Sequence, residues 1–121
     1  MIYIIDDDRE FAECITKMIL HTAKGVEIRI FSNAIEAINA MNEGLPELVF
    51  LDVLLDGPDG FTFLNEMSSY EDTEKISIVI MSSLDLAGRN LASYGVVETL
   101  NKAEMIPEDI KRIVKKYADK N

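Results

Sequence analysis

Four acidic residues follow directly on two apolar runs. A strand that ends in acid presents the acid at the edge of its sheet, and two such strands side by side gather at least three carboxylates into a small volume. Like charges about 5 Å apart repel by roughly 3 kcal/mol per pair at an effective dielectric constant of about 20. A hard divalent cation that prefers oxygen ligands would relieve this repulsion, so the pattern predicts a metal site. The residues are Asp6, Asp7 and Asp8 after the run 1–5, and Asp52 after the run 48–51.

Two further runs that we expect to be strands also end in polar residues that could do chemistry. Ser82 and Ser83 follow the run 76–81, and Lys102 follows the run 96–101. In open α/β sheets, ligands bind at the carboxyl ends of the strands, beside the point where the strand order reverses. If all four runs are strands of one parallel sheet, their polar ends build one site.

The residues of this site suit phosphoryl transfer. Asp7 and Asp52, with Asp6 behind them or bridged by water, could hold Mg²⁺ with waters completing an octahedron. One oxygen of Asp52 would remain free to attack phosphorus and form an acyl phosphate. Lys102 would add a mobile positive charge, and the Ser82 hydroxyl could donate a hydrogen bond to a phosphoryl oxygen. Phosphoryl transfer needs mainly such charge neutralisation and positioning.

Each feature has a plainer explanation when it is taken alone. An Asp-rich turn before a helix is commonly an N-cap that the helix dipole favours, and Asp59-Gly60 is commonly a plain turn. A lone lysine at a strand end is usually a surface residue, and Ser82 could simply end a strand. The functional interpretation therefore rests on the whole set, in its order along the chain.

Alternating strand and helix periods predict the elements that position these residues. Five short strand-like runs are each followed by apolar residues at helical spacing, which predicts an α/β fold with right-handed crossovers. The run 26–30 alternates with period two, as in a half-exposed edge strand, whereas 48–52 resembles the middle of a parallel sheet. The predicted strands are 2–6, 26–30, 48–52, 76–81 and 96–101.

The predicted helices are recognised by their apolar stripes and their end signals. Ser32 is expected to cap the second helix, Gly95 to end the fourth, and Pro107 to lie in the first turn of the last. The five stripes are Phe11, Ile15, Met18 and Ile19; Ile35, Ile38 and Met41; Phe61, Leu64 and Met67; Ala87, Leu91 and Tyr94; and Ile110, Ile113, Val114 and Tyr117.

Composition bounds the classes of function. The 121 residues are expected to form one domain, 1–121, that is long enough to bury a core. The net charge of −10 disfavours direct binding to nucleic acid or to an anionic membrane, because neutralising phosphates needs a basic surface. The single cysteine cannot form an internal disulfide, no apolar run approaches the roughly 18 residues that span a bilayer, and no signal peptide is recognised. We therefore expect a cytoplasmic protein.

Taken together, these motifs resemble the receiver domain of response regulators in two-component signalling. The similarity extends over essentially the whole chain, with the motifs in matching order and separation. It implies a flavodoxin-like fold: a doubly wound sheet of five parallel strands in the order 2-1-3-4-5, with five helices. The residues that carry it are Ile4-Ile5-Asp6-Asp7-Asp8, Leu51-Asp52-Val53, Asp59-Gly60, Ile80-Met81-Ser82-Ser83 and Leu100-Asn101-Lys102.

The resemblance also implies a role for each residue of the site. Asp52 would be the phosphoacceptor, and Lys102 would contact the phosphoryl group. Ser82 would supply the switch hydroxyl, and Thr99 occupies the second switch position. The metal, Mg²⁺ or Mn²⁺, would be held by Asp6, Asp7, Asp52 and the main-chain carbonyl of Leu54.

The partners follow by the same resemblance. The phosphodonor in this family is a histidine kinase or a histidine phosphotransfer protein. Members typically signal to a downstream protein or output domain through the face formed by the fourth helix, the fifth strand and the fifth helix. The only catalysis implied is Mg²⁺-dependent autophosphorylation from a donor and slow autodephosphorylation, so the chain is not expected to be an enzyme in the ordinary sense.

Several positions depart from the family pattern. Ala103 follows the lysine where the family usually has proline, often after a cis bond, and a non-proline cis bond would cost about 3 kcal/mol. Thr99 stands where the aromatic switch residue usually lies, and Asp56 replaces a frequent proline. Leu54 and Leu84 occupy the two positions that tune hydrolysis in the family. Neither leucine can orient an attacking water, so we expect slow self-dephosphorylation.

Other functions compete with that of a phosphorylated receiver. A receiver-like adaptor that binds partners without phospho-switching is favoured by Thr99 and Ala103, and opposed by the intact acids, hydroxyl and lysine. A Mg²⁺-dependent phosphohydrolase would use Asp6 as nucleophile and Asp8 as general acid, but that class wants Thr or Val where this chain has Glu10. No Gly-rich phosphate loop follows any strand, which disfavours nucleotide binding.

Overall fold

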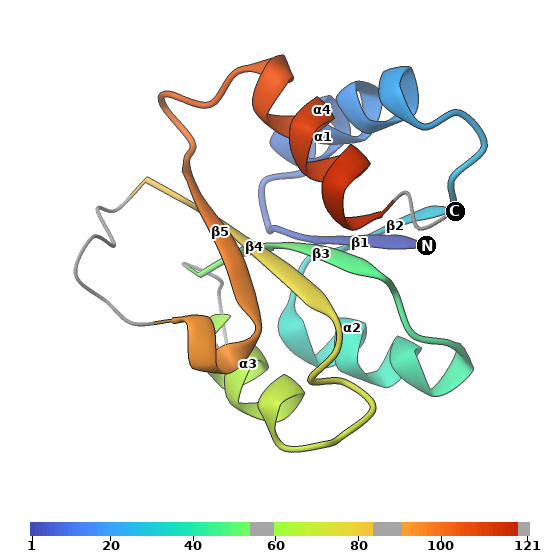
Figure 1. Cartoon of the computed structure of the whole chain (residues 1–121), viewed down its shortest axis with the longest axis vertical. Coiled ribbons are helices and arrows are strands. Elements are labelled where there is room, and N and C mark those ends of the chain that lie inside the picture. Colours follow the sequence, from blue (N-terminus) through green and yellow to red (C-terminus); the bar gives the residue numbers. More distant parts are fainter. Residues whose placement is uncertain (54–59, 84–90, 119–121) are drawn as a thin grey trace.

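The computed structural model describes residues 1–53, 60–83 and 91–118. Strands and helices alternate along these ranges, as the apolar periods predict (Figure 1). None of the helices in these ranges has the length and apolar character that crossing a membrane requires. The elements are β1 (Ile2–Ile5), α1 (Arg9–Thr22), β2 (Ile28–Phe31), α2 (Ala34–Ala40), η1 (Met41–Glu43), β3 (Leu48–Asp52), α3 (Gly60–Ser68), β4 (Ser77–Ser82), η2 (Ala92–Tyr94), β5 (Val96–Asn101) and α4 (Pro107–Tyr117).

The five strands form one parallel sheet in the order β2-β1-β3-β4-β5, which confirms the predicted topology. Every residue of β1 and β3 is buried, because both faces of the sheet are covered. β2 is only partly buried, in keeping with its alternating sequence and its place at the edge. The strand order reverses between β1 and β3, so the carboxyl ends of these two strands are where such a sheet binds ligands.

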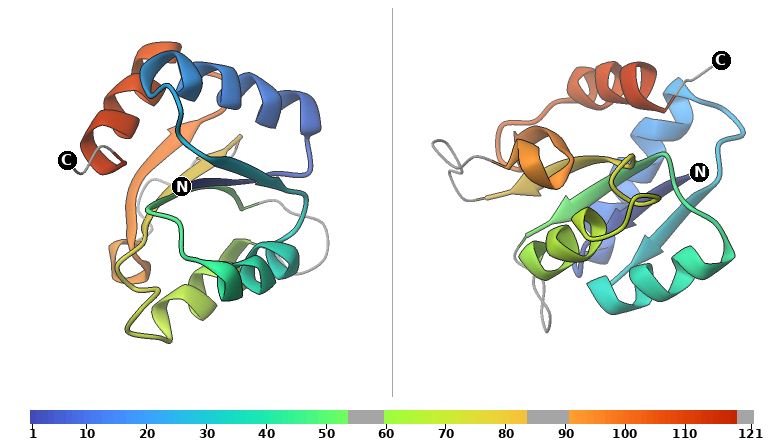
Figure 2. Two further views of the ribbon diagram at one scale, coloured as in Figure 1. Left: turned by 90° about the vertical axis from the view of Figure 1, so that its right-hand side faces the viewer. Right: turned by 60° about the horizontal axis from the view of Figure 1, so that its bottom comes forward.

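Helices cover both faces of the sheet. α1 and α4 pack together on one face, and α2 and α3 lie on the other (Figure 1 and Figure 2). Alternate strand residues therefore belong to two cores: Ile4 and Phe50 face α1 and α4, whereas Ile5 and Leu51 face α2 and α3. This two-sided burial fixes the register of the strands, because a slip of one residue would exchange the two faces.

The predicted count of five helices is not matched, since the described residues form four α-helices. Residues 84–90, which include Ala87 of the predicted fourth helix, lie outside the described ranges. The described end of that segment forms a single 3₁₀ turn, η2. Gly95, with a φ of 83°, ends this turn in the left-handed conformation that favours glycine.

The predicted stripe of the second helix holds at Ile38 and Met41, which pack into the core, but not at Ile35. Ala34 and Ala37 are buried, whereas Ile35 is 51% exposed. The N-cap is Asn33 rather than the predicted Ser32, so the helix begins one residue later than expected. Small side chains let the helix lie close to the sheet. The predicted stripe counts only large apolar residues and so passes over the alanines that face the sheet. The prediction is wrong at Ile35 for this reason.

Candidate functional site

The carboxyl ends of β1 and β3 lie side by side. Ile5 pairs with Leu51 in the parallel register, so Asp6 and Asp52 come next to each other on neighbouring strands. Carboxylate oxygens of Asp6, Asp7 and Asp52 all lie within 4.8 Å of one another. Asp6 and Asp52 are 1% and 5% exposed, whereas Asp7 is exposed. The structure thus gathers the three acids that the strand pattern predicted to meet.

Lys102 supplies positive charge to this acidic cluster. Its Nζ donates to Asp6 Oδ2 at 2.8 Å and to Asp52 Oδ2 at 3.2 Å. The lysine is directed toward the acids by the sheet, because its backbone N–H donates to Ser82 O at 2.9 Å and so continues the pairing of β4 with β5. The Lys102 side chain is 20% exposed, so the ion pairs are mostly shielded from water.

The three consecutive aspartates make three different sets of contacts. Asp6 uses both oxygens within the protein: Oδ2 accepts from Lys102, and Oδ1 accepts from the backbone N–H of Asp8 at 2.9 Å. Asp8 caps α1, since its Oδ1 accepts from the backbone N–H of Phe11 at 3.1 Å. The N-cap interpretation is therefore confirmed for Asp8, while Asp6 and Asp7 belong to the acidic cluster.

Burial and surplus negative charge govern ionisation in the cluster. Desolvation raises the pKa of the Asp6 carboxyl and outweighs the opposing hydrogen bonds from Lys102 and from the Asp8 N–H. Desolvation lowers the pKa of the Lys102 ammonium, but the hydrogen bond to Asp6 and the charges of Asp6 and Asp52 outweigh it, so the pKa is raised. The two shifts have different causes: burial favours the neutral form of Asp6, whereas the neighbouring carboxylates favour the charged form of Lys102. Three carboxylates gather within 4.8 Å of one another beside the Lys102 ammonium, so a further cation is favourable here.

The two predicted switch residues have different surroundings. Ser82 is 1% exposed and ends β4, where the preceding Met81 pairs with Asp52. Thr99 is exposed on β5, opposite Ile80. Ser82 therefore lies at the edge of the sheet that holds the acids, whereas Thr99 lies on the outermost strand with its side chain open to solvent.

Phe11 belongs to the site although its spacing predicted a core residue. Its ring centroid lies 4.5 Å from Lys102 Nζ, a distance at which the face of a ring attracts a cation. The side chain is half-buried rather than buried. No signal in the sequence separates this residue from the rest of the α1 stripe, because only the folded position of Lys102 brings the two together.

Gly60 fixes how closely α3 approaches the end of β3. Its backbone N–H donates to Val53 O at 3.4 Å. A Cβ on Gly60 would lie 2.6 Å from Val53 Cα, which is too close. Residue 60 must therefore be glycine for α3 to begin this near to Val53, the residue that follows Asp52. Leu54, Asp56, Asp59 and Leu84 lie outside the described ranges, as Ala87 does.

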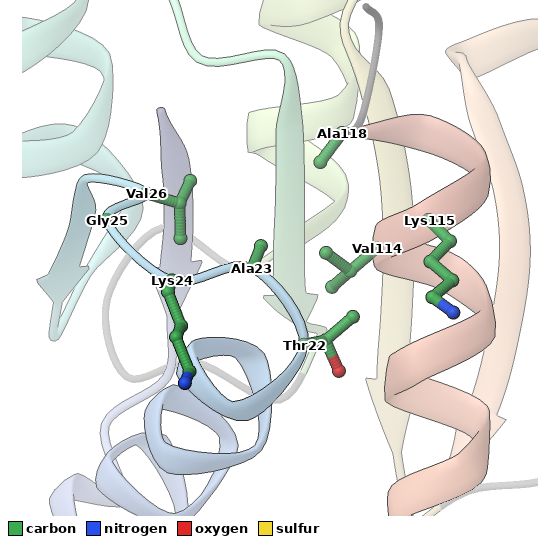
Figure 3. A pocket seen from close by; sticks show the side chains of 8 residues that line it. All are labelled: Thr22, Ala23, Lys24, Gly25, Val26, Val114, Lys115 and Ala118. Atoms are coloured by element: carbon green, nitrogen blue, oxygen red, sulfur yellow. The ribbon is translucent and has the colours of Figure 1, made fainter.

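A cavity of about 390 Å³ lies away from the acids. It is found where α1 and α4 end, at the amino end of the sheet, and its walls include Thr22, Lys24, Val114 and Lys115 (Figure 3). None of the predicted site residues lines this cavity. The chemistry predicted from the sequence therefore belongs to the opposite end of the molecule.

The motifs and the geometry agree with a known family. The family model of the response regulator receiver domain matches residues 2–115. The chain belongs to this family. Receiver domains accept phosphoryl groups in two-component signalling, bind Mg²⁺ through acidic residues, and interact with histidine kinases and downstream partners. The resemblance inferred from the strand-end motifs is thus confirmed.

Known proteins resemble this receiver domain over most of its length. A protein-glutamate methylesterase/protein-glutamine glutaminase of Rhodospirillum rubrum is 27% identical over 122 residues, which cover 97% of this chain and 32% of that protein. The chain thus spans about a third of the length of the curated relatives it matches.

Solved structures share the fold. The signal receiver domain of a DNA-binding response regulator from Colwellia psychrerythraea 34H is 25% identical with a TM-score of 0.81, covering 94% of this chain and 97% of that one. The receiver domain of NtrX from Brucella abortus is 22% identical with a TM-score of 0.82, covering 100% of both chains. These likenesses confirm the flavodoxin-like arrangement of the receiver domain.

Proposed function

We propose that this receiver domain is a phosphorylation-dependent switch in which Asp52 accepts a phosphoryl group in a Mg²⁺-dependent reaction. The environment of Asp52 carries the proposal. This buried carboxylate ends β3, lies within 4.8 Å of oxygens of Asp6 and Asp7, and is 3.2 Å from Lys102 Nζ. A phosphoryl group arriving here would meet a nucleophile, a positive charge and acids able to hold a metal. These are the parts that phosphoryl transfer requires.

The acidic cluster fits Mg²⁺ or Mn²⁺. Its donors are all carboxylate oxygens that lie within 4.8 Å of one another, and a hard dication would relieve their mutual repulsion. Both Asp6 oxygens already accept hydrogen bonds, so we assign Asp7 and Asp52 as direct ligands and Asp6 as a ligand through water. The main-chain carbonyl of Leu54 remains a predicted ligand. A bound ion would neutralise the acids and the incoming phosphoryl oxygens.

The proposed transfer is an in-line displacement at phosphorus. A bond forms between an Asp52 carboxylate oxygen and phosphorus while the bond from phosphorus to a histidine nitrogen of the donor breaks, and its electron pair stays on that nitrogen. The product is an acyl phosphate on Asp52. Lys102 already contacts the carboxylate that receives the group, so its ammonium can follow the phosphoryl oxygens. The buried Ser82 hydroxyl would donate to one of these oxygens.

We propose the partners by class. A histidine kinase or a histidine phosphotransfer protein would supply the phosphoryl group. A downstream protein or output domain would bind the surface formed by β5, α4 and the segment before β5. On this surface Arg112 Nη1 donates to Glu98 Oε2 at 2.6 Å and ties α4 to β5. A movement of Lys102, at the end of β5, would therefore be passed to α4.

Thr99 favours a second function, that of an adaptor that binds partners without a phosphoryl switch. In the family pattern an aromatic side chain at this place moves together with the switch hydroxyl. The exposed threonine offers no ring to bury. In such an adaptor the acids and Lys102 would remain together, but partner affinity would not depend on phosphorylation of Asp52.

Acetyl phosphate separates the two functions. With Mg²⁺ and acetyl phosphate, the wild-type chain is expected to gain one phosphoryl group by intact-mass spectrometry. The gain should vanish in Asp52→Asn and after removal of the metal with EDTA. Asp8→Asn is the matched control, because asparagine caps a helix as well as aspartate does and Asp8 lies outside the proposed transfer. No mass gain in the wild type would refute the switch and leave the adaptor.

The lifetime of the phosphorylated chain is a separate readout. We expect slow hydrolysis because Leu54 and Leu84 offer no group that orients a water. Intact-mass measurements after removal of acetyl phosphate, without any phosphatase, give the half-life directly. A half-life of seconds would contradict the expectation while leaving the phosphoacceptor role of Asp52 untouched.

A further inference from the structure

The two helical layers of the receiver domain differ in charge. The layer made by α2, η1, α3 and their flanking segments, residues 32–47 and 60–76, contains one basic residue, Lys75, against seven acidic ones. The layer of α1 and α4 carries charges of both signs. Among the described ion pairs, cations from outside the first layer reach only Glu43 and Glu47. The acidic residues of the first layer are Glu36, Glu43, Glu47, Glu66, Glu71, Asp72 and Glu74.

The same layer lacks cations where helices favour them. The C-terminus of a helix carries about half a negative charge, which basic side chains commonly offset. α1 and α4 have basic residues in their last turns, but α2 and α3 have none. Each helix runs back from the carboxyl end of the preceding strand, so α2 and α3 end at the edge of the sheet opposite the aspartates. The negative potential of the acidic residues of this layer therefore adds to that of the two helix ends, at the edge of the sheet where α2 and α3 end.

An apolar hollow of about 340 Å³ lies there, between the ends of α2 and α3. Met67, 2% exposed, contributes to its floor, and Leu45 and Tyr70, 42% and 58% exposed, line it near the surface. Glu66 and Asp72 also line it, and no ion pair among the described residues reaches either acid. Exposed large apolar side chains rimmed by polar groups mark interaction sites, and methionine adapts readily to a partner.

We propose that this hollow, the α2–α3 groove, binds a cationic amphipathic helix of another protein. An apolar side chain of that helix would lie between Leu45 and Tyr70. Its Lys or Arg residues would contact Glu66 and Asp72. Amphipathic helices commonly insert an apolar face into such grooves. Charge complementarity selects this occupant over an acidic or neutral one, and the net charge of −10 steers a cationic partner toward the molecule.

The α2–α3 groove is separate from the proposed switch. Asp52 ends β3 and so lies at the opposite edge of the sheet. α4 covers the opposite face of the sheet (Figure 1). A partner in the groove would leave both the acidic cluster and the β5–α4 surface accessible. The receiver domain could therefore bind this partner in either phosphorylation state, and Asp52→Asn is expected to bind it as the wild type does.

The test uses three labelled synthetic peptides. One is an amphipathic helix of leucine and lysine, the second has glutamate in place of lysine, and the third has serine in place of leucine. Fluorescence anisotropy at physiological ionic strength measures affinity, and ¹H–¹⁵N spectra of the chain locate the site. The leucine–lysine peptide should shift the signals of Leu45, Glu66, Tyr70 and Asp72. Each control peptide should bind at least about tenfold more weakly.

Paired charge reversals distinguish the groove from net charge. Glu66→Lys with Asp72→Lys should weaken binding of the leucine–lysine peptide about tenfold. Glu104→Lys with Glu108→Lys changes the net charge equally, at exposed positions beside and in α4 on the opposite face, and should weaken binding less than about twofold. Tyr70→Ala removes an exposed apolar wall without changing charge and should weaken binding about fivefold. Thermal melts verify that each variant folds.

Several results would overturn the proposal. Equal losses in the two charge-reversal variants would show that binding follows net charge alone. Shifted signals on α1 and α4 would place the peptide elsewhere, and tight binding of the serine peptide would show that the apolar groove is not used. A dimer in sedimentation velocity that Glu66→Lys with Asp72→Lys dissolves would make a second copy of the chain the occupant. None of these outcomes depends on phosphorylation of Asp52.

Discussion

Replacing Lys102 with methionine is expected to strengthen metal binding while weakening phosphoryl transfer. The Lys102 ammonium contacts Asp6 at 2.8 Å and Asp52 at 3.2 Å, on carboxylates that a dication would also use. At an effective dielectric constant of about 20, charges of +1 and +2 about 5 Å apart repel by roughly 7 kcal/mol. The lysine can swing toward water when a metal binds, so we retain only about a fifth of this repulsion. Lys102→Met should therefore bind Mg²⁺ about tenfold more tightly.

The same substitution should make folding depend on metal. Without Lys102, the acidic cluster loses its ammonium group. Its carboxylate oxygens lie within 4.8 Å of one another, so each pair of carboxylates repels by roughly 3.5 kcal/mol at the same dielectric constant. Asp7 is exposed, so water and salt screen much of this repulsion. We expect the free energy of unfolding in EDTA to fall by about 2 kcal/mol. Saturating Mg²⁺ should restore most of it, because the ion binds the folded state.

Calorimetric titration with Mg²⁺ and urea unfolding with and without EDTA measure both effects. Lys17→Met is the matched control, since Lys17 is an exposed residue of α1 and its loss changes the net charge equally. Phosphorylation of Lys102→Met by acetyl phosphate at saturating Mg²⁺ should be at least about tenfold slower than in the wild type. Unchanged or weaker Mg²⁺ binding by Lys102→Met would refute the idea that ammonium and metal compete for the same carboxylates.

Three other substitutions test neighbouring contacts. Phe11→Leu removes the aromatic ring whose centroid lies 4.5 Å from Lys102 Nζ, and it should slow phosphorylation about threefold, with recovery in Phe11→Tyr. If Phe11→Leu slowed phosphorylation equally in a Lys102→Met background, the contact between ring and ammonium would not be the cause. Gly60→Ala forces a Cβ to within 2.6 Å of Val53 Cα and should lower the free energy of unfolding in urea by about 2 kcal/mol, whereas an unchanged value would show that α3 shifts at no cost. Burial raises the pKa of the Tyr3 hydroxyl above 10.0, so the folded state keeps a proton that the unfolded state loses. Stability should be intact below about pH 10 and fall as pH rises above it, and Tyr3→Phe should flatten this dependence in unfolding measured between about pH 9 and 11.

The sheet and the acidic cluster could be predicted because both follow from the apolar period. β3 and β5 have the predicted bounds, and β4 is displaced by one residue. A parallel sheet places the carboxyl ends of its strands at one edge. The meeting of Asp6, Asp7 and Asp52 therefore follows from the strand assignments, without any knowledge of side-chain conformation.

The contacts of Phe11 and Ile35 could not be predicted in this way. A helical stripe identifies a face of the helix, but it does not say which side chains on that face lie deepest. α2 approaches the sheet on its alanines and leaves Ile35 exposed. The position of Phe11 beside the Lys102 ammonium depends on a loop from the far end of the chain, and no local pattern encodes it.

The turn after β5 holds Lys102 in place without the proline of the family pattern. The Lys102–Ala103 peptide bond is trans, as are the others in the described ranges. Ala103 has a backbone N–H, which proline lacks, and it donates to Asn101 Oδ1 at 2.8 Å. Asn101 thus closes the turn with its side chain, as asparagine does in an Asx turn. The main-chain carbonyl oxygen of Asn101 also accepts a hydrogen bond from the backbone N–H of Met105 at 2.9 Å.

This turn changes how the departures from the family pattern should be weighed. The backbone at Lys102 is held on one side by the Asn101 turn and on the other by the hydrogen bond to Ser82 O, so the ammonium reaches Asp52 without a proline. Ala103 therefore replaces one means of fixing the lysine with another and does not argue against phosphoryl transfer. Thr99 alone still favours the adaptor, and it bears on how a signal leaves the site rather than on whether Asp52 can be phosphorylated.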